Sequence, residues 1–314
     1  MAIHHQLRSS GDPYFAHETY RHLRTMLVAL PVLLLLGLVG AAFAFGLDSI
    51  QGSISAYYLG PMRDVFVGCM VGIAVCLVAY RGEALEDYAL NLAGFYALFV
   101  AFVPTQLAHS LAKLETEQER ADVVTSLRVT VTAVLLVTAA FLVLEAKTGH
   151  WPYRELRKNT VTRWFFRIST VLAVAFLVLL VWRTVEGTTF DNVHLAAALL
   201  LVASMATAVA SYAWPAPTGS LRPPTAGSRR RWESGSTGDG TGTYQWIFWL
   251  MVVGGIVIAV VAKLVFTSEY AVIIAELWEL GLFVAFWLIQ TIQKWEPPTA
   301  GELQQATEGA TGGA

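Results

Sequence analysis

Charged residues are scarce in this chain of 314 residues. Asp, Glu, Lys and Arg make up 14% of the sequence and hydrophobic residues 55%, whereas about a quarter of an ordinary soluble domain is charged. A soluble protein with this composition would have too few charged side chains to cover its surface. The composition therefore excludes an ordinary soluble domain and indicates an integral membrane protein.

Basic clusters and familiar catalytic motifs are also missing. The net charge is −2, and no basic block is interleaved with aromatic residues, so we predict no nucleic-acid partner. The sequence has no H-E-x-x-H, C-x-x-C or G-x-S-x-G pattern and no phosphate-binding glycine loop. These motifs would identify an enzyme class if they were present. The sequence therefore does not assign an enzyme class. It also contains no pattern that indicates an oligomeric state.

Only two cysteines occur, Cys69 and Cys76, seven residues apart on one predicted helix. At 1.5 Å per residue they lie about 10 Å apart along the helix axis, which is too far for a disulfide. We therefore predict that both are small apolar packing residues.

The chain does contain eight long apolar stretches, each close to the roughly 20 residues that a 30 Å hydrocarbon core requires. Backbone groups in lipid must be hydrogen-bonded internally, which favours a helix for each stretch. The sequence thus predicts an all-α fold, a polytopic transmembrane helix bundle of about eight spans. The spans are expected at 26–46, 62–80, 88–104, 126–146, 164–183, 191–213, 245–266 and 270–292.

The distribution of basic residues predicts the orientation. Of the 21 Lys and Arg residues, 15 fall on the side of the N-terminus and 6 on the other side. Because cytoplasmic loops are enriched in Lys and Arg, both termini are expected in the cytoplasm and the protein in the inner, cytoplasmic membrane. One alternative is cleavage after the small-x-small sequence at 42–44, which would leave seven spans.

Composition also predicts the domain organisation. Pro, Gly, Ser and Thr dominate segment 214–244, which cannot bury enough apolar surface to fold and is expected to be a flexible cytoplasmic linker. It would join a six-span core at 26–213 to a C-terminal hairpin at 245–293. Residues 1–25 are expected to be a cytoplasmic segment and 294–314 a disordered cytoplasmic tail. In 105–125, leucines at helical spacing predict an amphipathic extension of the third span.

The last span carries two carboxylates, Glu276 and Glu279. Residues three apart share a helix face, and Gln290 falls on the same face. A charged carboxylate facing lipid would cost several kcal/mol, so both acids should point into the bundle. They are candidates for binding a proton or a cation. The alternative is that they only hydrogen-bond to neighbouring helices.

The second span begins with an unusual density of polar groups at the expected outer interface. Ser53, Ser55, Tyr57 and Tyr58 precede Arg63 and Asp64. Arg63 is suited to the phosphate of a lipid headgroup because a guanidinium presents a fork of hydrogen-bond donors. Candidates for binding the same headgroup are Ser53, Ser55, Tyr57 and Tyr58. The alternative is interfacial anchoring by the tyrosines.

Two histidines fall on the same side of the membrane, His109 after the third span and His194 at the start of the sixth. Asp64, His194 and Glu276 are expected at a similar depth, which makes them candidate catalytic groups for acid–base or metal chemistry. Imidazole and carboxylate ligands suit zinc, although no ligand spacing assigns a metal. The alternative for His194 is a structural hydrogen bond.

At Ser53 to Gly68 and Asn91 to Thr105, the chain resembles bacterial multispan membrane proteins without an assigned activity. It is more faintly similar to the intramembrane lipid hydrolases related to alkaline ceramidases and adiponectin receptors. That resemblance implies a Ser, an Asp and three His around zinc at one membrane face. Ser53 or Ser55 with Asp64, His109 and His194 would fill four of these roles. The third histidine is missing on the outer side, where Glu276 is the available substitute.

Three functions are compatible with these patterns. Lipid handling or modification is favoured, with membrane lipids as partners, because the polar cluster lies at headgroup depth and few polar groups are expected in the inner half. Proton- or cation-coupled transport through Glu276 and Glu279 is the first alternative. The second is a non-catalytic assembly or accessory protein in which the polar groups only hold helices together.

Overall fold

The computed structural model of the protein describes residues 13–46, 50–60, 62–105, 107–112, 114–148, 156, 160–186, 190, 192–215, 239–265 and 270–293. Within these ranges the side chains of 13–17, 59, 108–110, 161 and 239–241 are not described. The described residues form helices joined by short connections, with no β-strand among them.

Among the described residues, six helices are long and apolar enough to cross a membrane, which indicates a multi-pass membrane protein. They are α1 (Pro13–Phe45), α5 (Glu117–Thr148), α7 (Thr160–Glu186), α8 (Val193–Ala213), the continuous helix from α10 (Asp239–Trp249) through η3 (Leu250–Gly254) to α11 (Gly255–Val265), and α12 (Ala271–Gln293).

Two shorter helices, α2 (Arg63–Ala79) and α3 (Ala84–Phe102), lie at the second and third predicted spans. Their 17 and 19 residues are mostly buried or half-buried. A short 3₁₀ helix, η2 (Ile54–Leu59), precedes α2, and a short helix, α4 (Leu107–Ala112), follows α3. Each predicted span therefore coincides with a helix.

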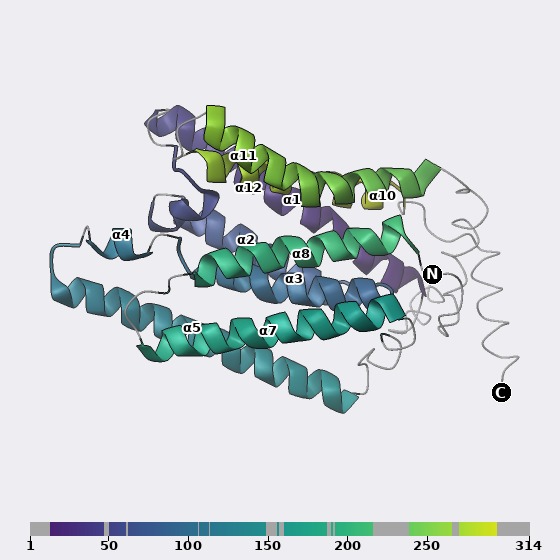
Figure 1. The fold of residues 1–314 in the computed structure, drawn as a ribbon, viewed down its shortest axis with the longest axis horizontal. Helices are drawn as coiled ribbons and strands as arrows, with labels where there is room; N and C mark the ends of the chain where they lie inside the picture. The colour runs from purple at the N-terminus through teal and green to yellow at the C-terminus, as the bar shows by residue number, and fades with distance from the viewer. Residues whose placement is uncertain are drawn as a thin grey trace, which may run out of the picture.

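The bundle is built around α2, α3 and α8. Figure 1 shows these helices between α1, α11 and α12 on one side and α5 and α7 on the other. α3 packs most extensively against α8 and α2, while α1 packs against α2 and α12. α5 buries only Leu127 and Val131 among its described side chains, so most of its apolar surface is available to lipid.

Small residues explain why α3 can occupy the centre. Ala89, Ala93, Ala97 and Ala101 recur every fourth position and are fully buried, which lets neighbouring helices approach closely. Gly94 continues this contact on the α2 side, because a Cβ atom there would lie 2.7 Å from the backbone oxygen of Ala74. The centre of the bundle thus depends on residues with little or no side chain.

Aromatic rings attach α7 to this centre. Phe176 of α7 lies edge-on to three rings of α3, with centroid distances of 6.1 Å to Phe95, 5.4 Å to Tyr96 and 5.4 Å to Phe99. Such edge-to-face pairs are favourable beyond the area they bury.

The connection at 105–125 differs from the predicted extension of the third span, and that prediction is wrong. α3 ends at Phe102, and Val103 has extended dihedral angles of φ −99° and ψ 106°. The cause is Pro104, which disfavours the helical region for the residue before it and has no N–H to donate. α5 then begins at Glu117, nine residues before the predicted start of the fourth span.

The predicted domain boundaries largely fall outside the described residues. Residues 1–12, 216–238 and 294–314 are not described, so the expected cytoplasmic linker and tail stay predictions. α10 begins at Asp239, six residues before the predicted start of the C-terminal hairpin.

Candidate functional site

The polar side chains gather at opposite ends of the bundle. At one end, which we call the Glu276 end, α1 and α3 finish and α2, α8 and α12 begin. Here the N–H of Ile273 donates to the carbonyl oxygen of Gly52 at 2.9 Å. The other end, which we call the Arg81 end, holds the connection between α2 and α3. At 1.5 Å per residue, the 19 residues of α3 separate the two ends by about 28 Å.

The Glu276 carboxylate ties α12 to the segment before α2. The Ser53 hydroxyl lies 2.8 Å and 2.9 Å from its two oxygens, and the N–H of Ile54 donates to Oε2 at 2.6 Å. Ser53 and Ser55 are buried, and their hydroxyl oxygens lie 2.8 Å apart. A hydroxyl this close to a carboxylate is within reach for proton transfer, so this cluster could serve both structure and acid–base chemistry.

The predicted substrate-binding residues divide into a buried and an exposed part. Tyr57 is buried, and its hydroxyl accepts a hydrogen bond from the N–H of Gln51 at 3.2 Å. Arg63 is exposed, with its guanidinium 5.0 Å from the centre of the Tyr58 ring. No described residue hydrogen-bonds or ion-pairs with the side chain of Arg63 or with that of its exposed neighbour Asp64.

His194 lies at the same end but has a structural partner. Its ring is buried, and Nδ1 lies 2.6 Å from the carbonyl oxygen of Val103, which joins the start of α8 to the end of α3. No hydrogen bond or ion pair joins Asp64, His194 and Glu276 to one another among the described residues. Asp64 is exposed rather than turned into the cluster.

No group of three or more His, Cys, Asp or Glu side chains that could hold a metal occurs among the described residues. The side chain of His109 lies outside the described part of the chain. Cys69 and Cys76 are free, as their spacing predicts. The zinc arrangement implied by the faint family resemblance therefore has no assembled counterpart in the described side chains.

Glu279 follows Glu276 by one helical turn but faces a different neighbour. Its carboxylate lies against Gly255, where a Cβ atom would be 2.3 Å from Oε1. The adjacent Trp278 donates from Nε1 to the carbonyl oxygen of Leu250 at 3.0 Å. The two acids thus share a helix face, but Glu276 contacts the segment before α2 and Glu279 contacts the helix paired with α12.

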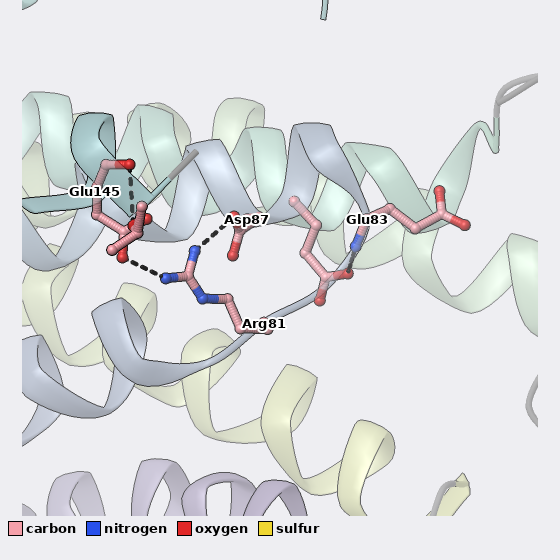
Figure 2. Close-up of polar contacts among 6 residues, drawn as sticks. Arg81, Glu83, Asp87 and Glu145 are labelled. Carbon is pink, nitrogen blue, oxygen red and sulfur yellow. Dashed lines mark hydrogen bonds and ion pairs between the residues drawn. The ribbon is translucent and has the colours of Figure 1, made fainter. Parts of the chain in front are cut away.

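An ion cluster occupies the Arg81 end, and Figure 2 shows Arg81 between two carboxylates. Nη1 of Arg81 lies 3.1 Å from Oδ2 of Asp87, and Nη2 lies 2.8 Å from Oε1 of Glu145. Burial disfavours the guanidinium charge, but the two carboxylates outweigh this and raise the pKa of Arg81 above its ordinary value. The cluster joins the connection between α2 and α3 to the last turn of α5.

A second network at the Arg81 end joins α3, α8, α10 and α12. Buried Glu86 accepts a hydrogen bond from the hydroxyl of Tyr212. The Tyr244 hydroxyl donates to Oε1 of Gln293 at 2.6 Å and accepts from Nε2 of Gln290 at 2.8 Å. Polar groups are therefore abundant at this end of the bundle. Under the predicted orientation it is the inner half, where we expected few of them.

Part of this network had a signal in the sequence. Arg81, Glu83, Glu86 and Asp87 place four charges between two apolar stretches, and a Glu three residues after a polar N-cap is typical of a capping box. That box is formed by Glu83 and Glu86 at the start of α3. The pairing of Tyr244 with two glutamines has no such signal, because it depends on how α10 and α12 pack.

Comparison of the chain with protein-family models, with curated proteins and with solved structures gives no match.

Proposed function

We propose that this multi-pass membrane protein handles phospholipids and holds a lipid headgroup at the Glu276 end. The observation that carries the proposal is the exposed guanidinium of Arg63, which lies over Tyr58 without a carboxylate partner among the described residues. A guanidinium fork matches the oxygens of a phosphate, and an aromatic face orients its plane.

The start of α2 supports the same ligand. Arg63 is the first residue of the helix, and Met62 at the N-cap provides no side-chain hydrogen bond. The N–H of Arg63 already donates to the carbonyl oxygen of Gly60 at 3.1 Å, so it is the positive end of the helix dipole that attracts an anion such as phosphate. A headgroup phosphate beside Arg63 would satisfy both the helix end and the guanidinium.

We further propose a topology of eight spans, with α2 and α3 crossing the membrane and both termini in the cytoplasm. The 15 basic residues on the side of the N-terminus support this orientation. In a cell with an inner, cytoplasmic membrane, Arg63 would then face headgroups of the outer leaflet. The resemblance to bacterial multispan proteins favours that membrane.

If the protein also modifies lipid, Glu276 is the acid–base group that we propose. It accepts a hydrogen bond from the buried Ser53 hydroxyl, which is the contact a general base needs with the proton it removes. Asp64 and His194 stay predicted catalytic partners at the same end of the bundle.

Native mass spectrometry of detergent-purified protein tests the headgroup proposal. Arg63→Gln should lower the amount of retained phospholipid several-fold, because it removes the charge and the fork. Arg183→Gln is the matched control, since Arg183 also lies over an aromatic ring, that of Trp182 at 5.0 Å, but is paired with Glu186 at 2.8 Å. Equal lipid retention by wild-type protein and Arg63→Gln would contradict the proposal.

Proton- or cation-coupled transport is a second candidate, favoured by the half-buried Glu279, whose Oε2 atom is buried. Here Glu279→Gln should abolish pH-dependent flux in vesicles while the fold is kept. Retained flux in this variant would count against transport through Glu279.

A further inference from the structure

α12 packs against the continuous helix that runs from α10 to α11. Two consecutive glycines, Gly254 and Gly255, face two consecutive side chains of α12. The ring of Trp278 lies 3.3 Å from where a Cβ atom of Gly254 would be, and Oε1 of Glu279 lies 2.3 Å from that of Gly255. An alanine at position 255 would therefore force the carboxyl group to move, so the absence of a side chain there makes room for Glu279 in this position.

The backbone at this point departs from a regular α-helix. Residues Leu250–Gly254 form a turn of π-helix, and the N–H of Gly255 donates to the carbonyl oxygen of Leu250. The Trp278 indole donates to the same oxygen at 3.0 Å. Single π-turns inside α-helices are frequent at functional sites, because they cost stability and reposition side chains. Here the turn, the glycine pair and Trp278 together form a seat for one carboxyl group.

The seated carboxyl group has no polar partner among the described residues. Oε2 of Glu279 is buried without a hydrogen bond, and no ion pair or hydrogen bond joins Glu279 to any described residue. An isolated carboxylate is very costly in an apolar environment unless it is paired or takes up a proton.

The other titratable groups on the elements packed against this seat are engaged elsewhere or exposed. On α12, Glu276 binds Ser53, and on η2 the Tyr57 hydroxyl accepts from Gln51. On α8, His194 hydrogen-bonds to the carbonyl oxygen of Val103, and Tyr212 hydrogen-bonds to Glu86. On α10, Tyr244 hydrogen-bonds to Gln290 and Gln293. Tyr58 of η2 lies under Arg63, Lys263 of α11 is exposed, and the described charged residues of α1 lie in 18–24, at the Arg81 end.

We propose that Glu279 is a proton-binding site, and that the Gly255 seat holds its carboxyl group in the neutral, protonated form. The ligand is a proton, and its release would leave a charge for which the seat offers no partner. Deprotonation would then favour separation of α12 from the π-turn, which links the charge of one residue to the packing of the hairpin. The inference does not depend on lipid binding at Arg63 and provides a site that coupled transport would need.

Infrared difference spectroscopy of the purified protein in phosphatidylcholine vesicles tests the proposal. A protonated carboxyl group has a carbonyl band that is distinct from the bands of a carboxylate and shifts in D₂O. The wild-type protein should show such a band near neutral pH, Glu279→Gln should lose it, and Glu276→Gln should keep it. Gly255→Ala should shift or remove the band, because the added methyl group displaces the carboxyl.

A spectrum in which Glu279→Gln removes only carboxylate absorption would overturn the proposal, since the group would then be ionised and balanced by a bound cation. Thermal unfolding provides an independent readout. Glutamine is a neutral near-isostere of the protonated acid, so Glu279→Gln should fold and unfold within a few degrees of the wild-type protein. Failure of this variant to fold would also count against a neutral resting carboxyl.

Discussion

At the scale of single residues, the two acids of α12 have different neighbours, Ser53 for Glu276 and Gly255 for Glu279. Glu276 and Glu279 stand out because a carboxylate inside an apolar stretch is conspicuous. Their contacts come from far away in the chain, since Ser53 lies 223 positions before Glu276. Two acids on one helix face also end in different environments, because Glu276 contacts Ser53 and Ile54 whereas Glu279 lies against Gly255. Local spacing does not contain that information.

The Ser53 hydroxyl is the main side-chain partner of Glu276, so Ser53→Ala should destabilise the protein. We expect a loss of about 1–2 kcal/mol, the usual range for a hydrogen bond to a charged or buried acceptor. Ser55→Ala is the control, because its hydroxyl contacts Ser53 rather than the carboxylate, and it should cost less. Denaturant unfolding in detergent measures both, and an equal effect of the two substitutions would contradict the assigned roles.

Arg81 serves two carboxylates, so Arg81→Ala leaves Asp87 and Glu145 without their shared cation. The cost should be about 1–2 kcal/mol, below the 3–5 kcal/mol of a fully buried pair, because the Arg81 side chain is 37% exposed. Arg81→Lys keeps the charge but lacks the two-armed fork, and should recover only part of the loss. Unchanged thermal unfolding of Arg81→Ala would show that this cluster does not stabilise the fold.

At the scale of elements, hydrophobicity predicted the position of every long helix because lipid imposes both length and apolar composition. It failed where one residue overrides the pattern, as Pro104 does at the end of α3. The π-turn at Leu250–Gly254 also had no local signal besides two adjacent glycines. Gly68 and Gly72 lie four residues apart on α2, a spacing of small residues that favours close helix contact. Only Gly72 makes such a contact, since its Cβ would lie 2.8 Å from Leu30 of α1, whereas nothing lies within 4 Å of that of Gly68.

Two matched substitutions, at Gly94 and at Gly68, test the close packing of α2 against α3. Gly94→Ala should destabilise the protein by about 1–3 kcal/mol, because the added methyl meets the backbone of Ala74 and cannot be relieved by side-chain rotation. Gly68→Ala should be neutral or stabilising by up to about 1 kcal/mol, since alanine favours a helix and the site is open. Thermal unfolding in detergent compares them, and equal stability would show that the α2–α3 contact is looser than described.

At the scale of the whole molecule, composition was enough to place the chain in a membrane. The arrangement of α2, α3 and α8 at the centre could not be predicted, because it depends on which helices present small residues to one another. The polar network at the Arg81 end was missed for the same reason. Because polar groups occupy both ends of the bundle, a scarcity of polar groups is no longer an argument against transport.

The proposed topology predicts opposite accessibility for two exposed threonines, Thr116 before α5 and Thr148 at its end. In a background with Cys69→Ala and Cys76→Ala, Thr116→Cys should react with a membrane-impermeant maleimide in intact cells. Thr148→Cys should react only after the membrane is permeabilised. The reverse pattern would show that the orientation is inverted.

The headgroup proposal is tested most directly by an experimental structure of the protein in a phospholipid bilayer. We predict phosphate density within hydrogen-bonding distance of the Arg63 guanidinium, beside Tyr58 and the first turn of α2. An Arg63 side chain paired with Asp64, with no ordered lipid at the Glu276 end, would contradict it.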